Sequence, residues 1–174
     1  MSEHLHVVCP SCDARNRLPA GRLGEDPKCG RCQAALFPGD QVLPKISSNV
    51  SVFPTEPDGD PLTDWLTSLK AIKARIPDDV LVLPAHNDPF FGLHARIDHL
   101  VTGHERGLER LHKLIAEPKR VVDVFGVLFR RKIDEYLLGL ATGESLAHLN
   151  CLIARGEAVR ERDENGVDWY RVAA

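Results

Sequence analysis

The chain has 174 residues, of which 43% are apolar and 27% are charged, and its formal net charge is −3. These proportions are ordinary for a soluble globular protein. The small acidic excess argues against a general attraction to nucleic acid or to anionic membranes. No apolar run reaches the roughly 18 residues of a transmembrane helix, so we expect no membrane-spanning segment.

Two C-x-x-C pairs stand near the N-terminus. Cys9-Pro10-Ser11-Cys12 and Cys29-Gly30-Arg31-Cys32 are separated by sixteen residues. This spacing is typical of a zinc ribbon, in which two short loops each offer two thiolates to one tetrahedral Zn²⁺. The proline and the glycine favour the tight turns that such loops need. We therefore predict a structural zinc ion bound by Cys9, Cys12, Cys29 and Cys32.

Two other uses of these cysteines are less consistent with the sequence. Disulfides would suit a secreted chain, but Met1-Ser2-Glu3-His4 does not resemble a signal peptide, so we expect a cytoplasmic protein. A redox dithiol would need one C-x-x-C between a buried strand and a helix. The fifth cysteine, Cys151, lies in an apolar helical pattern and is expected to be a buried small hydrophobic residue.

The cysteine-rich segment resembles the N-terminal zinc ribbon of thioredoxin 2. The resemblance covers residues 5–37 and rests on Val7 to Cys12, on Asn16-Arg17-Leu18-Pro19, and on Pro27 to Cys32 with Leu36-Phe37. In that family the ribbon precedes a thioredoxin domain with a Trp-Cys-Gly-Pro-Cys active site. This sequence has no such motif, so the resemblance implies zinc binding and no thioredoxin activity. A segment this short needs its metal to fold.

Three elements are predicted in the middle of the chain. Apolar residues at helical spacing from Trp65 to Ile76, followed by Pro77, predict one helix. Val80-Leu81-Val82-Leu83 predicts a short strand buried on both faces, which leads to Pro84-Ala85-His86. A second amphipathic helix is expected from Leu93 to Ile115. Its polar face carries four histidines that we expect to be solvated, namely His94, His99, His104 and His112.

From Gly39 onward the chain resembles the C-terminal half of a metallo-β-lactamase-fold hydrolase with a C-terminal appendage. The residues that carry the resemblance are Gly39 to Pro44, Ser48 to Ser51, Leu83 to His86, and Pro89 to Ile97. The resemblance implies that Asp40 and His86 correspond to a bridging and a terminal metal ligand. The family's His-x-His-x-Asp-His motif is absent, because His4-Leu5-His6 is followed by Val7-Val8. A two-metal hydrolytic centre needs more ligands than one Asp and one His.

The last third of the chain reads as helices followed by a hairpin. Apolar residues from Val121 to Phe129, and again from Leu146 to Ile153, predict helices, and Gly156 would end the second one. Asn165-Gly166 between residues 158–162 and 167–171 is a hairpin signal. We therefore predict a winged helix, which resembles the appendage of the same hydrolases.

The charge of this unit argues against DNA as its partner. Residues 117–174 contain nine Lys and Arg side chains and ten Asp and Glu side chains, whereas phosphate binding needs a basic face. Only His148, Asn150 and Arg155 are plausible base or phosphate contacts on the helix that would read DNA.

Together these patterns predict an α+β chain of three units. They are a zinc ribbon at 1–37, part of a metallo-β-lactamase-like αββα domain at 38–116, and a winged helix at 117–174. We interpret the chain as a zinc-binding, non-catalytic fusion or remnant of a hydrolase. Two alternatives stay open: a hydrolase of esters or thioesters whose site is completed by another chain or by His4 and His6, and a nucleic-acid-binding adaptor. Half of a sandwich leaves an apolar face uncovered, so we also expect homodimerisation through this half or through the winged helix.

Overall fold

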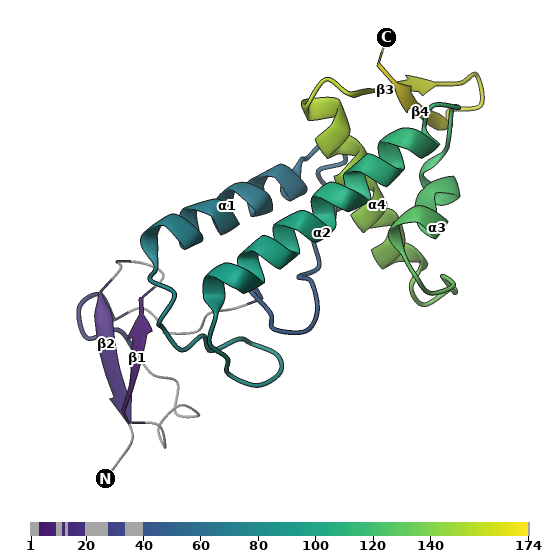
Figure 1. The fold of residues 1–174 in the computed structure, drawn as a ribbon. Coiled ribbons are helices and arrows are strands. Elements are labelled where there is room, and N and C mark those ends of the chain that lie inside the picture. The colour runs from purple at the N-terminus through teal and green to yellow at the C-terminus, as the bar shows by residue number, and fades with distance from the viewer. Residues whose placement is uncertain (1–3, 10–11, 13, 20–27, 34–39, 174) are drawn as a thin grey trace. The chain divides into compact units, whose positions relative to one another are not determined.

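The computed structural model describes residues 4–9, 12, 14–19, 28–33 and 40–173 (Figure 1). The chain forms two compact units. Unit 1 comprises Met1–Ser48 and Ser68–Leu100, and unit 2 comprises Asn49–Thr67 and Val101–Ala174. The division of the sequence at residues 37 and 116 stays a prediction.

Unit 1 contains a small antiparallel hairpin. Strand β1 (His4–Val8) pairs with β2 (Arg15–Pro19), and Val8 lies opposite Arg15. The first C-x-x-C loop connects the two strands, and the Cys9 N–H donates to the Ala14 carbonyl at 2.9 Å where the strands end. Residues 34–37, which the thioredoxin 2 resemblance includes, lie outside the described residues. The observed partner, β2, lies between the two cysteine pairs.

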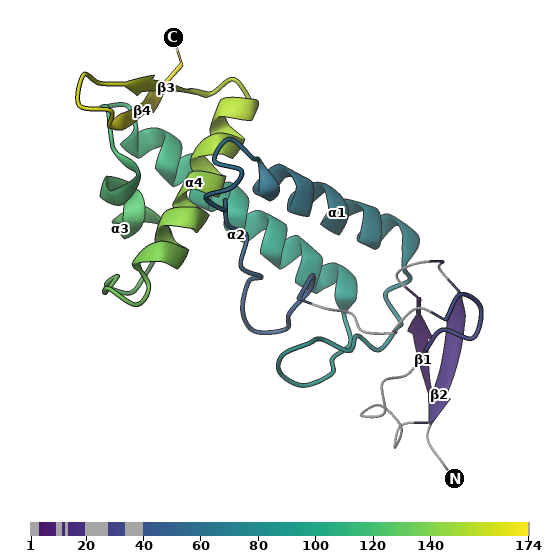
Figure 2. The same cartoon turned by 180° about the vertical axis from the view of Figure 1, so that it is seen from behind.

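The remainder of unit 1 consists of loops held against helix segments. The helix segments in unit 1 are the C-terminal part of α1 (Pro61–Arg75) and the N-terminal part of α2 (Leu93–Leu114). These two segments run side by side (Figures 1 and 2). Lys73 of α1 donates to both carboxylate oxygens of Asp98 on α2, at 2.5 and 2.6 Å. Both helices were predicted from their apolar periodicity, and both predictions are confirmed.

The predicted strand at residues 80–83 is wrong. This segment forms a single antiparallel bridge, in which Val82 exchanges two hydrogen bonds with Phe90 at 2.8 and 3.1 Å. Only Val82 is buried, and the other three residues of the segment are half-buried. A strand needs a pairing partner along its whole length, and the described part of unit 1 provides one only at Phe90. Accordingly, the expected sheet of the αββα half is not formed by the described residues of the middle segment.

Unit 2 contains the remaining helices and a second hairpin. The 3₁₀ helix η2 (Val121–Val124) and the short α3 (Phe125–Leu128) precede α4 (Leu138–Ala154). This helix begins eight residues before Leu146, the first residue of the apolar run that predicted it. The prediction that Gly156 ends this helix is confirmed, because Gly156 follows the end of α4 with a φ of +73°. The core of unit 2 contains buried side chains from α2 and the residue after it, η2, α4 and the C-terminal hairpin, whereas α3 buries none of its residues. Among them are Leu108, Leu111, Ile115, Val124, Leu149, Leu152 and Tyr170.

The C-terminal hairpin was predicted from its turn and is confirmed. Strand β3 (Ala158–Arg162) pairs antiparallel with β4 (Asp168–Val172), beyond the C-terminal end of α4 (Figure 2). The Asp163 N–H donates to the Val167 carbonyl at 2.9 Å, and Gly166 has a φ of +78°. The loop therefore contains three residues, with glycine in the left-handed conformation that such loops use.

Candidate metal centre

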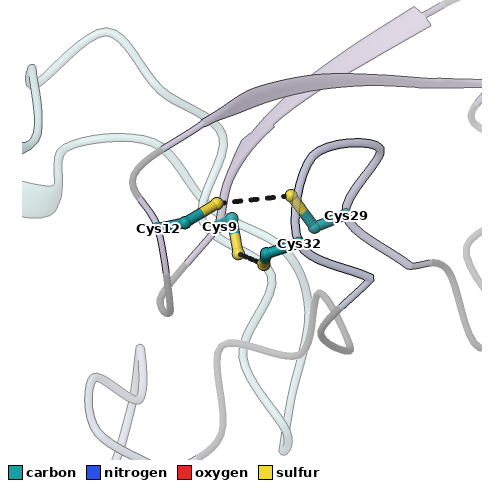
Figure 3. A group of neighbouring side chains, drawn as sticks. All are labelled: Cys9, Cys12, Cys29 and Cys32. Atoms are coloured by element: carbon teal, nitrogen blue, oxygen red, sulfur yellow. Dashed lines mark hydrogen bonds between the residues drawn. The ribbon is translucent and has the colours of Figure 1, made fainter.

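The two C-x-x-C loops bring four thiols together. The Sγ atoms of Cys9, Cys12, Cys29 and Cys32 all lie within 4.8 Å of one another (Figure 3). Two pairs face each other across the loops, Cys9 with Cys32 at 3.5 Å and Cys12 with Cys29 at 3.6 Å. All four are free cysteines. The sequence-predicted ligand set is thus assembled by the fold.

The spacing of the sulfurs fits a tetrahedral zinc ion. With Zn–S bonds of about 2.3 Å, the sulfurs of a regular tetrahedron lie about 3.8 Å apart. The observed separations of 3.5 and 3.6 Å are close to this value, whereas a disulfide would need about 2.0 Å. Four cysteines close together fit a structural zinc ribbon. Such an ion has all its positions filled by sulfur and stabilises the fold without an open site for water.

Hydrogen bonds around the second loop favour thiolates there. The Arg31 N–H and the Asn16 amide both donate to the Cys29 Sγ, at 3.4 and 3.5 Å. Hydrogen bonds from the backbone of Cys32 and then of Arg31, together with those from Asn16 and Cys12, outweigh the opposing effect of burial and lower the pKa of Cys29 to about 6. For Cys12, a backbone hydrogen bond with Ala14 lowers the pKa, but burial and the three other thiols together raise it to about 12. Without metal, the cluster therefore retains protons on part of its sulfurs, which a zinc ion would displace.

The backbone conformation of the second loop orients the sulfurs of Cys29 and Cys32 toward those of Cys9 and Cys12. The Gln33 N–H donates to the Cys29 carbonyl at 2.9 Å, and Gln33 itself has a φ of +62°. The Asn16 side chain links β2 to this loop, because its Oδ1 accepts from the Gly30 N–H at 2.8 Å. Asn16 is therefore a supporting residue of the metal centre that the cysteine spacing alone did not indicate.

Apolar contacts surround the cysteines. Cys9 and Cys29 are fully buried, and Cys12, Ala14 and Leu83 pack against them. Leu83 ends the apolar segment that we expected to be a strand, and it lies three residues before His86. Its side chain instead contributes to the hydrophobic cover of the thiol cluster.

The second candidate pair, Asp40 and His86, also comes together. His86 Nε2 lies 3.3 Å from Asp40 Oδ1, and both side chains are more than half exposed. Among the described residues, the four cysteines are the only group of three or more potential metal ligands. The pair that the hydrolase resemblance identified is thus close in space, but it is not joined by a third described ligand. The side chains of His4 and His6 lie outside what the structure describes.

The loop that carries Asp40 is fixed by polar contacts within unit 1. The guanidinium of Arg96 on α2 donates to the carbonyls of Leu43 and Ile46, at 2.6 and 2.8 Å. The Ser48 hydroxyl donates to the Asp40 carbonyl. Val42 and Leu43 are buried, so the loop is anchored through its backbone while the Asp40 carboxylate stays accessible.

The three side chains named as the plausible DNA contacts make contacts within the protein instead. His148 and Asn150 are 3% and 6% exposed. The Asn150 amide donates to the carbonyls of Pro57 and Gly59, at 3.0 and 2.8 Å. Arg155 makes two hydrogen bonds with the Glu105 carboxylate, at 2.8 and 2.9 Å. The expectation that these three residues could serve as nucleic-acid contacts is therefore wrong, because all three are engaged within unit 2.

The predicted solvent exposure of one α2 histidine is also wrong. His104 is only 8% exposed, although we expected all four to be solvated. His94 is half-buried, and its Nε2 lies 2.8 Å from the Ile76 carbonyl. A sequence signal for this burial was missed, because His104 lies four residues from both Leu100 and Leu108 and therefore falls on the buried apolar face of α2.

Comparison with known proteins finds that the two ends of the chain match two different family models. Residues 8–34 match the family model for the thioredoxin 2 N-terminal region, and residues 108–173 match the C-terminal domain of metallo-beta-lactamase-like proteins. Thioredoxin C-3 from Corynebacterium nephridii is 50% identical over 36 residues, which cover 21% of this chain and 25% of that protein.

Two solved structures resemble a larger part of the chain. A beta-lactamase domain protein from Burkholderia ambifaria shares 42% identity with a TM-score of 0.75, over 79% of this chain and 40% of that one. A metallo-beta-lactamase family protein from Thermus thermophilus shares 27% identity with a TM-score of 0.64, over 78% of this chain and 41% of that one. The chain thus spans about two fifths of these relatives. It combines a segment that matches the thioredoxin 2 zinc ribbon with one that matches the C-terminal domain of metallo-β-lactamase-like proteins.

Proposed function

We propose that this protein binds one structural zinc ion through its ribbon and that its metallo-β-lactamase-like part is a non-catalytic remnant. One observation carries the proposal: the described residues gather three or more metal ligands only at the four cysteines. A two-metal hydrolytic centre holds each ion with several nitrogen or oxygen ligands and keeps a position for the attacking hydroxide. Asp40 and His86 provide one carboxylate and one imidazole.

The C-terminal unit supports a packing role. We infer that α4 and the β3–β4 hairpin form a winged helix, since the helix ends at Ala154 and the first strand begins at Ala158. Its helix buries His148 and Asn150 instead of presenting them. We also place the protein in the cytoplasm, because four free thiols at a zinc-binding distance suit a reducing compartment.

Metal analysis of the purified chain tests the proposal. We expect one zinc per chain in the unmodified protein, none in Cys29→Ser/Cys32→Ser, and one in Asp40→Ala/His86→Ala. The Cys151→Ser variant is a matched control, because Cys151 is buried away from the cluster and should leave the zinc content unchanged. Two or more tightly held ions that are lost from the Asp40→Ala/His86→Ala variant would contradict the proposal.

A second candidate function is favoured by the 3.3 Å separation of His86 Nε2 and Asp40 Oδ1. In this alternative, the exposed pair is half of a hydrolytic metal site that another chain completes. The same metal analysis separates the two candidates, because the alternative requires additional ions that depend on His86. It also requires metal-dependent hydrolysis of an ester or thioester that disappears in His86→Ala.

A further inference from the structure

Two histidines from different helices meet in the interior of unit 2. His104 on α2 and His148 on α4 are 8% and 3% exposed. His104 Nδ1 lies 3.2 Å from His148 Nε2, and the two rings are nearly parallel, with centroids 5.3 Å apart. This direct side-chain hydrogen bond connects α2 to α4 and is unrelated to the metal centre of unit 1.

The surrounding backbone fixes which nitrogens carry protons. His148 Nδ1 lies 2.8 Å from the carbonyl oxygen of Glu144. A carbonyl can only accept, so the hydrogen must be on His148 Nδ1. A neutral imidazole has one N–H, so His148 Nε2 is bare and accepts from the N–H of His104 Nδ1. The chain of donors therefore runs in one direction, from His104 to His148 to the Glu144 carbonyl.

The environment of the pair favours its neutral form. The Trp65 ring of α1 packs edge-on against His104, with centroids 5.0 Å apart. Burial, with a smaller contribution from the charge of His148, lowers the pKa of His104 to about 4. Burial also lowers the pKa of His148, against the opposing effect of its bond to the Glu144 backbone.

Two acidic residues, Glu105 and Glu144, lie close to the histidine pair and affect the pH dependence of this region. Glu105, next to His104 in α2, favours the charged form of His104, but its carboxylate is held by two hydrogen bonds from Arg155. The Glu144 side chain is itself perturbed, since burial raises the pKa of its carboxyl to about 7. The hydrogen bonds that His148 makes go to the Glu144 backbone and to His104, so both of its ring nitrogens are engaged.

We propose that the His104–His148 pair is an acid-sensitive latch between α2 and α4. A second proton on His148 would place an N–H on Nε2, so the hydrogen bond would be kept only if His104 moved its own hydrogen from Nδ1 to Nε2, and the buried pair would then carry a positive charge. A second proton on His104 would leave the bond in place but would bury a positive charge beside Trp65. Both events favour separation of the helices.

The sign of the pH effect follows from the lowered pKa values. Unfolded histidine titrates near 6.5, so below that pH the unfolded chain binds more protons than the folded one. The contribution of His104 to stability is therefore complete above about 6.5 and is lost as the pH falls toward about 4. Glu144 acts in the opposite sense, because its raised pKa gives stability that is present at low pH and lost as the pH rises through about 7.

Urea unfolding of the full zinc-bound chain at pH 8 and pH 5 tests the latch. Both tryptophans, Trp65 and Trp169, lie in unit 2, so their fluorescence reports on this unit. His104→Asn keeps an N–H near the position of Nδ1 and does not titrate. Linkage predicts that acidification raises the unfolding constant about 30-fold more in the unmodified protein than in His104→Asn.

Two further variants separate the latch from other acid effects. His112→Asn lies on the same helix and should retain the full acid response of the unmodified protein. Glu144→Gln removes the opposing carboxyl and should enlarge the acid response. Effects common to all variants, including loss of zinc, cancel in the comparison. Equal acid responses in His104→Asn and the unmodified protein would overturn the proposal.

A measurement on the unmodified protein tests the proposal even if the variants fail to fold. Nitrogen-15 spectra of the imidazoles at pH 7.5 should show both His104 and His148 neutral and protonated at Nδ1. A proton on Nε2 of His148 at this pH would overturn the assignment of donors and with it the latch.

Discussion

Gly143 lies where α4 passes closest to the segment that precedes α1. The Val52 N–H donates to its carbonyl at 3.0 Å, and a Cβ at this position would lie 2.9 Å from the Val52 carbonyl oxygen. The Cβ of Ser51 would be 3.0 Å away. Because the nearest atom belongs to backbone, the contact cannot be relieved by a change of rotamer. The glycine is therefore required by close packing within unit 2.

Gly143→Ala should destabilise unit 2 by about 1–3 kcal/mol, the usual cost of overpacking a well-packed interior. Gly139→Ala is the matched control, since it lies in the same helix and its Cβ would meet nothing within 4 Å. That change should be neutral or stabilising by up to about 1 kcal/mol, because alanine is the better helix former. Urea unfolding followed by tryptophan fluorescence measures both. Equal stability of the two variants would show that the segment around Val52 moves aside freely.

Single residues differ in how far their roles could be predicted from the sequence. The four cysteines were predictable because their spacing encodes the geometry of the ligand set. Asp40 and His86 were identified by resemblance, and the structure places them 3.3 Å apart. The burial of His104 was missed although its spacing from Leu100 and Leu108 places it on the apolar face of α2. The burial of His148 and Asn150 depends on contacts across unit 2, with His104 and with the carbonyls of Pro57 and Gly59.

At the scale of elements, the β1–β2 hairpin depends on the loops that follow its strands. Two strands of five residues each are marginal in water on their own. The loop that joins the two strands begins at Cys9, whose N–H donates to the Ala14 carbonyl. The Asn16 side chain connects β2 to the second cysteine loop. A structural zinc ion contributes on the order of 10 kcal/mol in such small units. The hairpin and the metal centre are therefore expected to form together.

Removal of zinc by a strong chelator should unfold the hairpin and leave the β3–β4 hairpin of unit 2 folded. In amide proton–nitrogen spectra, we expect the signals of β1 and β2 to collapse toward random-coil positions. The signals of β3 and β4 should stay dispersed. A β1–β2 hairpin that keeps its dispersed signals after complete zinc removal would show that the ribbon folds without metal.

Elements with a local signal were predicted, and an element that needs a distant partner was not. The helices α1 and α2 and the C-terminal hairpin follow from apolar periodicity and turn residues. The strand expected at residues 80–83 has the right composition, but it finds only Phe90 to pair with among the described residues. Its Leu83 packs on the cysteine cluster.

For the whole molecule, segments that match two different family models lie in one chain. The ribbon matches thioredoxin 2 proteins, and the rest resembles about two fifths of metallo-β-lactamase family structures. No helix among the described residues is both long and apolar enough to cross a membrane. Homodimerisation stays a prediction, for which the exposed Tyr136, Leu138 and Leu140 of unit 2 are candidate contacts.

The most direct test of the central claim is zinc X-ray absorption on the purified chain. A single structural site predicts one shell of four sulfur atoms at about 2.3 Å and no nitrogen or oxygen ligands. The Asp40→Ala/His86→Ala variant should give the same spectrum. A shell of nitrogen or oxygen atoms that disappears in this variant would contradict the account, because it would show that Asp40 and His86 still hold a metal ion.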